Sequence, residues 1–494
     1  MGEIYSSCKS VYIWLGIPQT EVETHSEKGN RPPETPINPF TLALHFANDR
    51  HMHELPCFEF SKGQWSFVPS PLFQELWLLH KEVTTQAWWS RLWCVQEAIL
   101  SPSAMVVFGR WRIPLSILKA AEMSHAYHVS SCCTQITALF PTVEHLVRSD
   151  QLLWIRQQDA KNTDTSPRKV FSDIDKVFRT FRYKLCQNPR DRIYGLLGLL
   201  DPNMQPRIVP DYTRSIGQTF LDAMEVLTAH SRGDLRYLTG SGFCSQEHGL
   251  PSWVRNFAAS ISQEATYEEV IRYEAYDLYN AAASTRADPK CMYDSILSLI
   301  GIRVDKITEI GLPVLGDNED SSWRVLFSWS KMFKRADSPG RSTPDAMDIG
   351  AFWRVVLADT MLVDKPKCRR LTAEDVPRTN ISWDDSRVPH FVSGPRRSME
   401  RSLQATTYGR SMFLTEGGRI GLCLPECRVG DEVWVLHGGK VPFVLRLSDR
   451  PTTKGRSGET IRSHRFIGDV YLRGIMDGEA MGGSSYTTRE VLLL

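Results

Sequence analysis

The chain has 494 residues, 42% of them hydrophobic, which is enough to bury the cores of two or three domains. Lys and Arg number 58 and Asp and Glu number 57, so a formal net charge of +1 favours neither nucleic acid nor an anionic membrane as a partner. No stretch approaches the roughly 20 apolar residues that span a bilayer. The 11 scattered cysteines indicate reduced thiols. We therefore expect a globular, cytoplasmic protein.

The N-terminal part is predicted to be an α/β unit. A strand at Val11–Leu15 is apolar on both faces, as in a buried parallel strand. Residues 20–66 are rich in Pro, Asn, His and charge, which predicts a variable insertion with the HMH segment at 51–53 exposed. Apolar residues then recur at helical spacing from Leu72 to Leu100, and a second buried strand follows at Ala104–Phe108. Strand, helix and strand in this order favour an α/β fold.

The middle of the chain, residues 113–334, is predicted to be mainly helical. Apolar stripes run from Val177 to Leu185 and from Ile216 to Leu227, the second after a cap candidate at Ser215. In the NPRD segment at 188–191, the Asn can cap a helix, the Pro fits its first position, and the Asp lies in its first turn. We therefore predict that a helix begins there.

The C-terminal part changes to β texture after polar, Pro-rich segments at 335–348 and 372–397, which predict a linker-rich stretch at 335–400. Residues 401–494 contain short apolar or alternating runs divided by Gly-Gly, Gly-Asp and Pro. This pattern predicts a small β-barrel or sandwich. Gly438-Gly439-Lys440 lacks the other residues of a phosphate loop, and we interpret it as a hairpin turn.

Three blocks of sequence resemble a known family. They are IYSSCKSVYIWLG with WWSRLWCVQEAILSPSAMVVFG; NPRDRIYGLLGLLDP with VPDYT and PSWVRNF; and, from Tyr408, GRIGL, VGDEVWVLHGG, PFVLR and FIGDVYLRGIMDGEA. In this order they resemble the fungal heterokaryon-incompatibility (HET) domain proteins over nearly the whole chain. The residues that match the family motifs are Trp93, Gln96, Glu97, Pro189, Arg190, Asp191, Tyr194, Gly198, Gly421, Gly430, Asp431, Gly474, Gly478 and Glu479.

The resemblance implies a partial HET domain with a TIR-like parallel sheet at residues 1–112, carrying the insertion at 20–66. A mainly helical region at 113–334, the linker-rich segment at 335–400 and the β-rich domain at 401–494 would follow. Family members begin with strands resembling "alSYvWG" and "wiDalCInQ", and neither stands before Met1. We therefore expect a domain truncated at its N-terminus, with unpaired sheet edges.

The resemblance also implies a function, with alternatives. The leading hypothesis is an interaction or signalling protein of fungal self/non-self recognition and programmed cell death, with other proteins of that pathway as partners and no cofactor. One alternative is an NAD-cleaving TIR-like enzyme in which Glu97 stabilises a ribosyl cation. We favour a structural role for Gln96 and Glu97, because carboxylates in such settings are often structural. The other alternative is an inactive, truncated paralogue.

A metal site is considered and not predicted. His125 and His128 lie one helical turn apart, with Cys132 and Cys133 just beyond, and zinc could use such residues. No second pair of ligands stands at the spacing of a zinc finger. A solvated helix face beside two buried thiols is therefore the favoured interpretation, and it applies equally to the pair Cys423 and Cys427.

Overall fold

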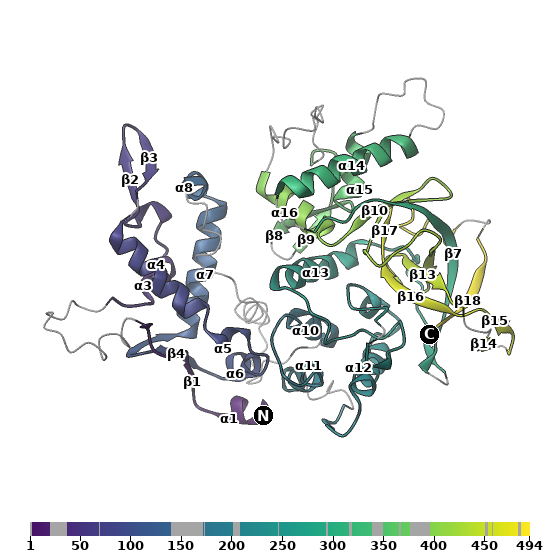
Figure 1. The fold of residues 1–494 in the computed structure, drawn as a ribbon, viewed down its shortest axis with the longest axis horizontal. Coiled ribbons are helices and arrows are strands. Elements are labelled where there is room, and N and C mark those ends of the chain that lie inside the picture. Colours follow the sequence, from purple (N-terminus) through teal and green to yellow (C-terminus); the bar gives the residue numbers. More distant parts are fainter. Residues whose placement is uncertain are drawn as a thin grey trace, which may run out of the picture. The chain divides into compact units, whose positions relative to one another are not determined.

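The computed structural model describes most of the chain (Figure 1). The described residues are 2–19, 37–68, 70–139, 171, 173–200, 208–245, 247–292, 295–315, 319–337, 349–364, 367–375, 396–449, 453–456, 458–482 and 486–494. The chain divides into two compact units, residues 1–173 with 184–205 and residues 174–183 with 206–494. This division differs from the predicted ranges. The predicted middle region, residues 113–334, is divided between the two units, and its segments alternate between them.

The sheet of the first unit has three described strands, in the order β1 (Val11–Trp14), β4 (Ala104–Phe108) and β5 (Trp111–Pro114). β1 and β4 are parallel, whereas β4 and β5 are antiparallel. The prediction that the first strand is buried on both faces is wrong. Ile13 is buried, but Tyr12 is 65% and Trp14 is 57% exposed, because β1 lies at the edge of the described sheet and packs on one face only.

Helices and one hairpin complete the first unit. Its elements are α1 (Gly2–Ser7), α3 (Thr41–Ala47), η1 (Met52–Glu54), β2 (Phe58–Ser61), β3 (Gln64–Phe67), α4 (Pro71–Thr84), α5 (Ala87–Ser90), α6 (Cys94–Leu100), α7 (Leu115–Ser130), α8 (Thr134–Leu139), α11 (Asp191–Tyr194) and η3 (Leu197–Leu199). The predicted single or paired helix at 72–100 is thus three helices. α4 begins as its sequence suggests, because Pro71 occupies the first position and the Ser70 side chain accepts from Phe73 N.

Part of the predicted insertion at 20–66 is packed, which corrects that prediction. Phe46, Met52 and Cys57 are fully buried and belong to a core that α3, α4, α7 and the β2–β3 hairpin share. Residues 20–36 lie outside the described residues. The polar composition concealed this core, because its apolar residues are separated by His, Glu and Asn rather than repeated at one spacing.

The second unit combines helices with a β-barrel. Its helical elements are α10 (Ile174–Thr180), α12 (Ile216–His230), η4 (Arg236–Leu238), η5 (Glu247–Gly249), α13 (Gln263–Ala275), η6 (Tyr276–Leu278), α14 (Glu319–Asp337), α15 (Ile349–Val356) and α16 (Arg396–Thr407). The predicted cap of α12 is present, since the Ser215 side chain accepts from Gln218 N at 3.1 Å.

The barrel closes through one long strand. β7 (Leu297–Ile310) pairs with β18 (Thr488–Leu493) at one end and with β12 (Glu432–Leu436) in its middle. β12 continues to β13 (Phe443–Leu447), β13 to β16 (His464–Asp469), and β16 back to β18, so five strands form a closed ring. The far end of β7 pairs with β10, which extends the sheet through β11 to β17. Their bounds are Ser411–Thr415, Ile420–Cys423 and Tyr471–Leu472.

Two predictions about the second unit need correction. The middle region is not wholly helical, because β7 and the short β6 (Lys290–Cys291) lie within it. The stretch at 335–400 is not only linker, because α15 packs Phe352 and Trp353 into the core and β8 (Thr360–Asp364) pairs with β9 (Lys367–Arg370). The hairpin turn at Gly438–Lys440 is present between β12 and β13. A last small pair joins β14 (Thr453–Lys454) to β15 (Thr460–Ile461).

Candidate functional site

Two of the sequence blocks that carry the family resemblance pack together in the first unit. Trp93, directly before α6, donates its indole N–H to the Asp191 carboxylate at 3.1 Å. Gln96 lies on the buried face of α6 and donates through Nε2 to the Gly195 carbonyl at 2.6 Å. The donors and acceptors are 98 and 99 residues apart in sequence. The motif residues therefore hold α6 against α11 and η3.

The contact of η3 with α6 and α1 requires a glycine at position 198. A Cβ atom at this position would lie 2.7 Å from Gln96 Oε1 and 3.2 Å from the Cα of Gly2. Both distances are shorter than ordinary van der Waals contact. The close approach of α1, α6 and η3 therefore depends on the missing side chain.

The helix α11 is shorter than predicted, and its N-terminal cap differs from the predicted one. Asn188 Oδ1 accepts from Arg190 N at 3.1 Å, as a capping side chain does, but the α-helix covers only Asp191–Tyr194. The 3-10 turn η3 then follows at Leu197–Leu199. Pro189 precedes the helix, and the Arg190 side chain also contacts Asn188 Oδ1, at 3.3 Å. Tyr194 is buried. This segment forms a compact corner against which α6 packs.

Glu97 uses both carboxylate oxygens within the same unit. Oε2 accepts from the Trp88 indole N–H at 3.1 Å, and Oε1 accepts from the Tyr5 hydroxyl at 3.3 Å. Partial burial, together with the Glu97 charge, raises the pKa of Tyr5, so this hydroxyl remains a donor at neutral pH. The carboxylate links α1, α5 and α6, which is what a structural acid does.

The second unit contains a buried charge network that the motif residues did not indicate. Arg179 donates to Asp175 at 2.8 Å and to Glu269 at 3.0 Å. Arg182 reaches Glu269 at 3.2 Å, and Arg255 reaches Asp175 at 2.9 Å. All five side chains are buried. α10, α13 and the segment that carries the PSWVRNF block therefore meet through ion pairs.

The sequence contains a weak signal for this network. Arg179 and Arg182 interrupt the apolar run FRTFRY, and a charged residue on an apolar helix face needs a buried partner. Burial alone would raise the pKa of Glu269, but the guanidinium groups of Arg182 and Arg179 lower it to about 2. The partner on α13 could not be identified from spacing, since it lies 90 residues away.

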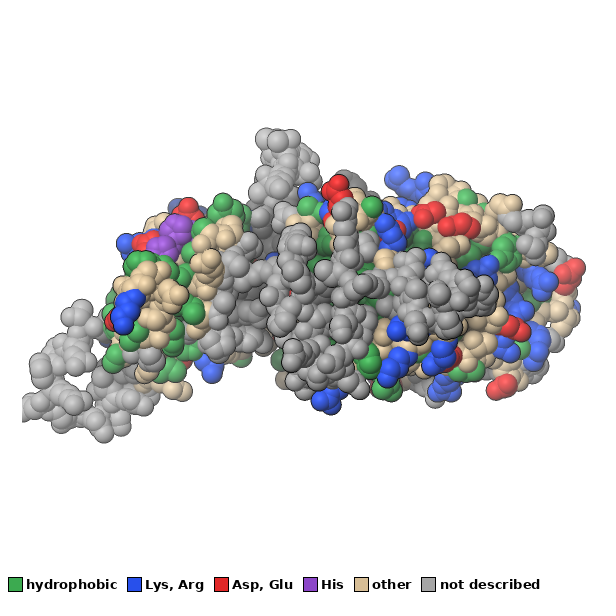
Figure 2. All heavy atoms as spheres, turned by 90° about the horizontal axis from the view of Figure 1, so that it is seen from above, with side chains coloured by type: hydrophobic (Ala, Val, Ile, Leu, Met, Phe, Trp, Pro, Cys, Tyr) green, Lys and Arg blue, Asp and Glu red, His purple; other side chains and the backbone are tan. Residues whose placement is uncertain are grey.

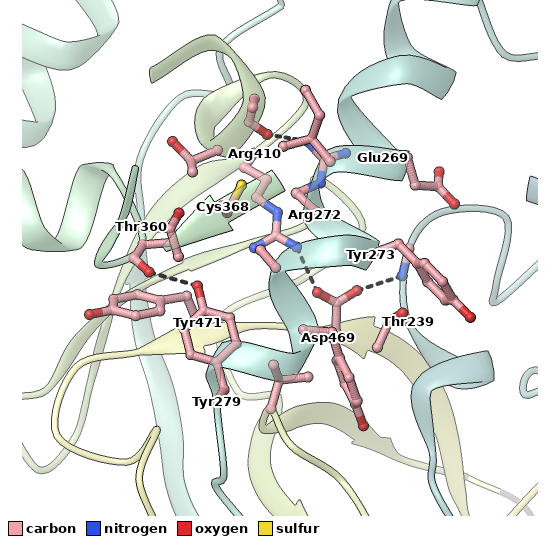
Figure 3. A pocket seen from close by; sticks show the side chains of 18 of the residues that line it. Thr239, Glu269, Arg272, Tyr273, Tyr279, Thr360, Cys368, Arg410, Asp469 and Tyr471 are labelled. Atoms are coloured by element: carbon pink, nitrogen blue, oxygen red, sulfur yellow. Dashed lines mark hydrogen bonds and ion pairs between the residues drawn. The ribbon is translucent and has the colours of Figure 1, made fainter. Parts of the chain in front are cut away.

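A small cavity borders this network (Figure 3). Arg410 donates to Asp469 at 2.6 Å, and the other oxygen of this carboxylate accepts from Gly240 N at 2.7 Å. Burial, together with the charge of the neighbouring Arg410, lowers the pKa of Arg272 to about 10. The cavity volume is about 50 Å³, which holds a few water molecules at roughly 10–15 Å³ each. Pockets for drug-sized ligands measure roughly 300–1,000 Å³, so this cavity is too small for a dinucleotide.

The motif residues of the C-terminal block lie at turns and close strand contacts of the barrel sheet. Asp431 accepts two hydrogen bonds from Arg446, at 2.7 and 2.8 Å, directly after Gly430. A Cβ at Gly421 would lie 2.1 Å from the Tyr471 carbonyl, so β11 and β17 approach only through glycine. Three further motif residues form the turns after β17: Gly474 and Gly478, both at positive φ, and Glu479, which accepts from Asp477 N.

The histidines and cysteines of the first unit are arranged differently from the prediction. His125 is buried against Phe46, and burial lowers its pKa to about 4. His128 instead faces Cys132 and Cys133, and these three residues meet His51. The HMH segment is therefore not simply exposed, because His51 is partly buried and Met52 is fully buried. The other cysteine pair, Cys423 and Cys427, is buried in the core of the barrel sheet.

Comparison with known proteins confirms the resemblance seen in the sequence. Residues 397–489 match the family model of the Het-6 beta-barrel domain, which covers the strands from β10 to β17 and reaches the start of β18. Residues 397–489 of the second unit are thus similar to this domain, whereas β7, which closes the barrel, lies outside the match.

A curated relative extends this similarity to nearly the whole chain. Over 557 residues the chain is 24% identical to "Heterokaryon incompatibility protein 6, OR allele" of Neurospora crassa, covering 97% of this chain and 78% of the relative. No solved structure matches. Within the described part of the chain, no helix is long and apolar enough to cross a membrane.

Proposed function

We propose that the chain is an interaction and signalling component of heterokaryon incompatibility, acting in fungal self/non-self recognition and programmed cell death. The observation that carries this proposal is the similarity over 97% of the chain to a protein named for heterokaryon incompatibility. The Het-6 beta-barrel domain at 397–489 supports it from a second, independent comparison.

The geometry supports recognition by surfaces rather than by a deep substrate pocket. The two motif blocks of the first unit are used to pack α6 against α11 and η3, and Glu97 is held by Trp88 and Tyr5. The cavity beside the ion pairs of the second unit holds only a few waters, and a larger hollow of about 510 Å³, bordered by Glu225, Trp253 and Leu297, is open to solvent rather than deep. We propose that the partners are other proteins of the incompatibility pathway, and that both units act in the cytoplasm.

A heterokaryon assay tests this proposal. The full chain is expressed under an inducible promoter in Neurospora crassa strains that are otherwise compatible, and hyphal growth and vital-dye uptake are scored after fusion. We expect growth arrest and dye-positive hyphal compartments on induction, because an incompatibility component triggers death when it meets a non-matching partner. Unchanged growth in every strain pairing would contradict the proposal and favour an inactive paralogue.

The variant Glu97→Gln separates the proposal from the NAD-cleaving alternative. Gln keeps the size of the side chain: its carbonyl oxygen can accept from Trp88 and its amide N–H can donate to the Tyr5 hydroxyl, but it cannot stabilise a cation as a carboxylate does. We expect the variant to arrest growth like the unaltered chain, with cellular NAD unchanged before dye uptake. An early fall in NAD that Glu97→Gln abolishes would instead support the enzyme.

A further inference from the structure

Four potential metal ligands converge in the first unit, here called the His-Cys cluster: His51, His128, Cys132 and Cys133. Their ligand atoms all lie within 4.8 Å of one another. His51 precedes η1, His128 lies in the last turn of α7, and the two cysteines lie in the connection from α7 to α8. Three of the ligands therefore lie close together in the sequence. The fourth, His51, lies 77 residues before His128 (128 minus 51).

Five of the six distances among the ligand atoms of the His-Cys cluster are close to those around one tetrahedral ion, and the sixth, between the two histidine nitrogens, extends to 4.8 Å. Zn–S bonds of about 2.3 Å and Zn–N bonds of about 2.0–2.1 Å place two sulfurs about 3.8 Å apart and a sulfur and a nitrogen about 3.6 Å apart. The two sulfurs are 3.9 Å apart. The Nδ1 atom of His51 lies 3.4 and 3.5 Å from them, and that of His128 lies 3.0 and 3.9 Å away. The sulfur separation also excludes a disulfide, whose bond measures about 2.05 Å.

Asp49 orients one of these ligands. His128 Nε2 lies 3.1 Å from Asp49 Oδ1, and the same oxygen accepts from the Ser124 hydroxyl at 3.0 Å. A hydrogen on Nε2 that is donated to Asp49 leaves Nδ1, which faces the sulfurs, with a free lone pair. Carboxylates in this position behind a metal-bound histidine fix its tautomer and orientation.

The surroundings favour a charge-balanced site at the edge of the core, because two of the four ligands are buried, whereas His51 is partly exposed and Cys132 is exposed. Cys133 and His128 are 1% and 3% exposed, and Cys133 Sγ also accepts from the Met52 backbone N–H at 3.4 Å. Two thiolates and a divalent cation sum to zero charge, which burial tolerates far better than two separate charges. Sulfur and imidazole ligands select zinc over magnesium or calcium. His45, His51 and His53 are each partly exposed, and histidine side chains are visible at the surface in Figure 2.

We infer that the His-Cys cluster binds one structural Zn²⁺ ion, which joins the segment between α3 and η1 to the connection between α7 and α8. All four positions of the tetrahedron are filled by protein, so the site has no open position for a substrate. The ion would cross-link two segments of one core, since Met52 and Cys133 both belong to it. Zinc binding therefore stabilises the first unit.

Metal analysis of the purified full chain tests this inference. The protein is prepared under reducing conditions, dialysed against buffered zinc at a fixed free concentration, and measured by inductively coupled plasma mass spectrometry. We expect about one zinc ion per chain, since four protein ligands complete one tetrahedral site. Replacement by Co²⁺ should give the visible absorption of tetrahedral cobalt together with a sulfur-to-cobalt charge-transfer band. Absence of bound zinc from the fully reduced chain would overturn the inference.

Matched variants locate the ion. The double variant Cys132→Ser/Cys133→Ser should lose zinc and the charge-transfer band, and Asp49→Ala should weaken zinc binding roughly 10–100-fold. His51→Ala, at a partly exposed position, removes one ligand with little loss of core packing. His53→Ala and Cys291→Ser, which lie outside the His-Cys cluster, should keep one zinc ion. Circular dichroism checks that each variant is folded. Equal zinc content in the cluster variants and the two controls would refute the site.

Discussion

Gly198 is the position at which the family motifs of the first unit touch most closely. Its Cα faces Gln96 on α6 and Gly2 on α1, and no space remains for a side chain. Gln96 cannot easily move away, because it is buried and its Nε2 atom is bonded to the Gly195 carbonyl. Close packing therefore explains the glycine at position 198, the second glycine of GLLGL. The family motif at this residue marks an internal contact rather than a ligand site.

Gly198→Ala should destabilise the first unit by about 1–3 kcal/mol, the usual effect of overpacking a buried contact. The added methyl group must displace Gln96 Oε1 or separate α1 from η3. Urea unfolding, followed by tryptophan fluorescence, measures the change. Gly482→Ala is the matched control, since no atom lies within 4 Å of its Cβ position. A free energy of unfolding equal to that of the unaltered chain would show that α6 and η3 do not pack as described.

Single residues also show what sequence could not reveal. Trp93 and Asp191 were both identified as motif residues, but nothing in their spacing indicated that one bonds to the other. The His-Cys cluster is a sharper case. Three members were considered together with His125 and set aside because no second pair of ligands stands at zinc-finger spacing, and the structure adds His51 from a segment predicted to be an insertion. Contacts between segments this far apart depend on tertiary packing, which one sequence does not encode as a local pattern.

At the scale of elements, β7 carries the architecture of the second unit. It pairs with β6, β18, β12 and β10 in turn, so the barrel and the additional strands both depend on it. The strand was missed in the sequence because its first half, LSLIGI, is buried almost throughout and lacks the alternation of a half-exposed strand. A short apolar run of this kind cannot be distinguished from a buried helix by periodicity. The strands at 411–476 were found because glycine turns divide them.

The last strand, β18, is the element whose loss should open the barrel. Leu492 on this strand is fully buried and pairs with Ser298 of β7. Leu492→Ala should lower the free energy of unfolding of the second unit by about 2–5 kcal/mol, through lost burial and the remaining cavity. Arg489→Ala, on the same strand but exposed, should change it by less than about 0.5 kcal/mol. Urea titration of both variants checks this, and equal effects would mean that β18 is not part of the core.

At the scale of the whole molecule, both units have apolar cores, and the second unit also has a network of buried ion pairs. The second unit buries the ion pairs of Arg179, Arg182 and Arg255 with Asp175 and Glu269. The described core of the first unit that includes Met52 is built mainly of aliphatic, aromatic and thiol side chains. The predicted fold class, an α/β part followed by helices and a C-terminal barrel, agrees with this structure in outline, while the interleaved boundary at 174–205 had no signal in composition.

These buried ion pairs predict that acid destabilises the second unit. Burial alone would raise the pKa of Glu269, but Arg182 and Arg179 lower it from its ordinary 4.5 to about 2. In the same unit, Arg410 lowers the pKa of Asp469 against the opposite effect of burial. A carboxylate with a lowered folded pKa stabilises the fold fully above its unfolded pKa, and this contribution is lost as the pH falls toward the folded value. For Glu269 the window is therefore about pH 4.5 to 2, and the loss is on the order of 3 kcal/mol.

Hydrogen exchange with a labelling pulse at one fixed pH, after equilibration at pH 7, 4.5 and 3, measures this loss by peptide. We expect peptides of α10 and α13 to lose protection between pH 4.5 and 3, because α13 carries Glu269 and α10 carries its partner Arg179. Glu269→Gln should be less stable at pH 7, since it leaves Arg182 without its buried carboxylate, and its stability should depend less on pH. Glu309→Gln, from the exposed pair with Arg335, should keep the full acid dependence. If Glu269→Gln and Glu309→Gln showed the same pH dependence, the buried network would not be the source of acid sensitivity.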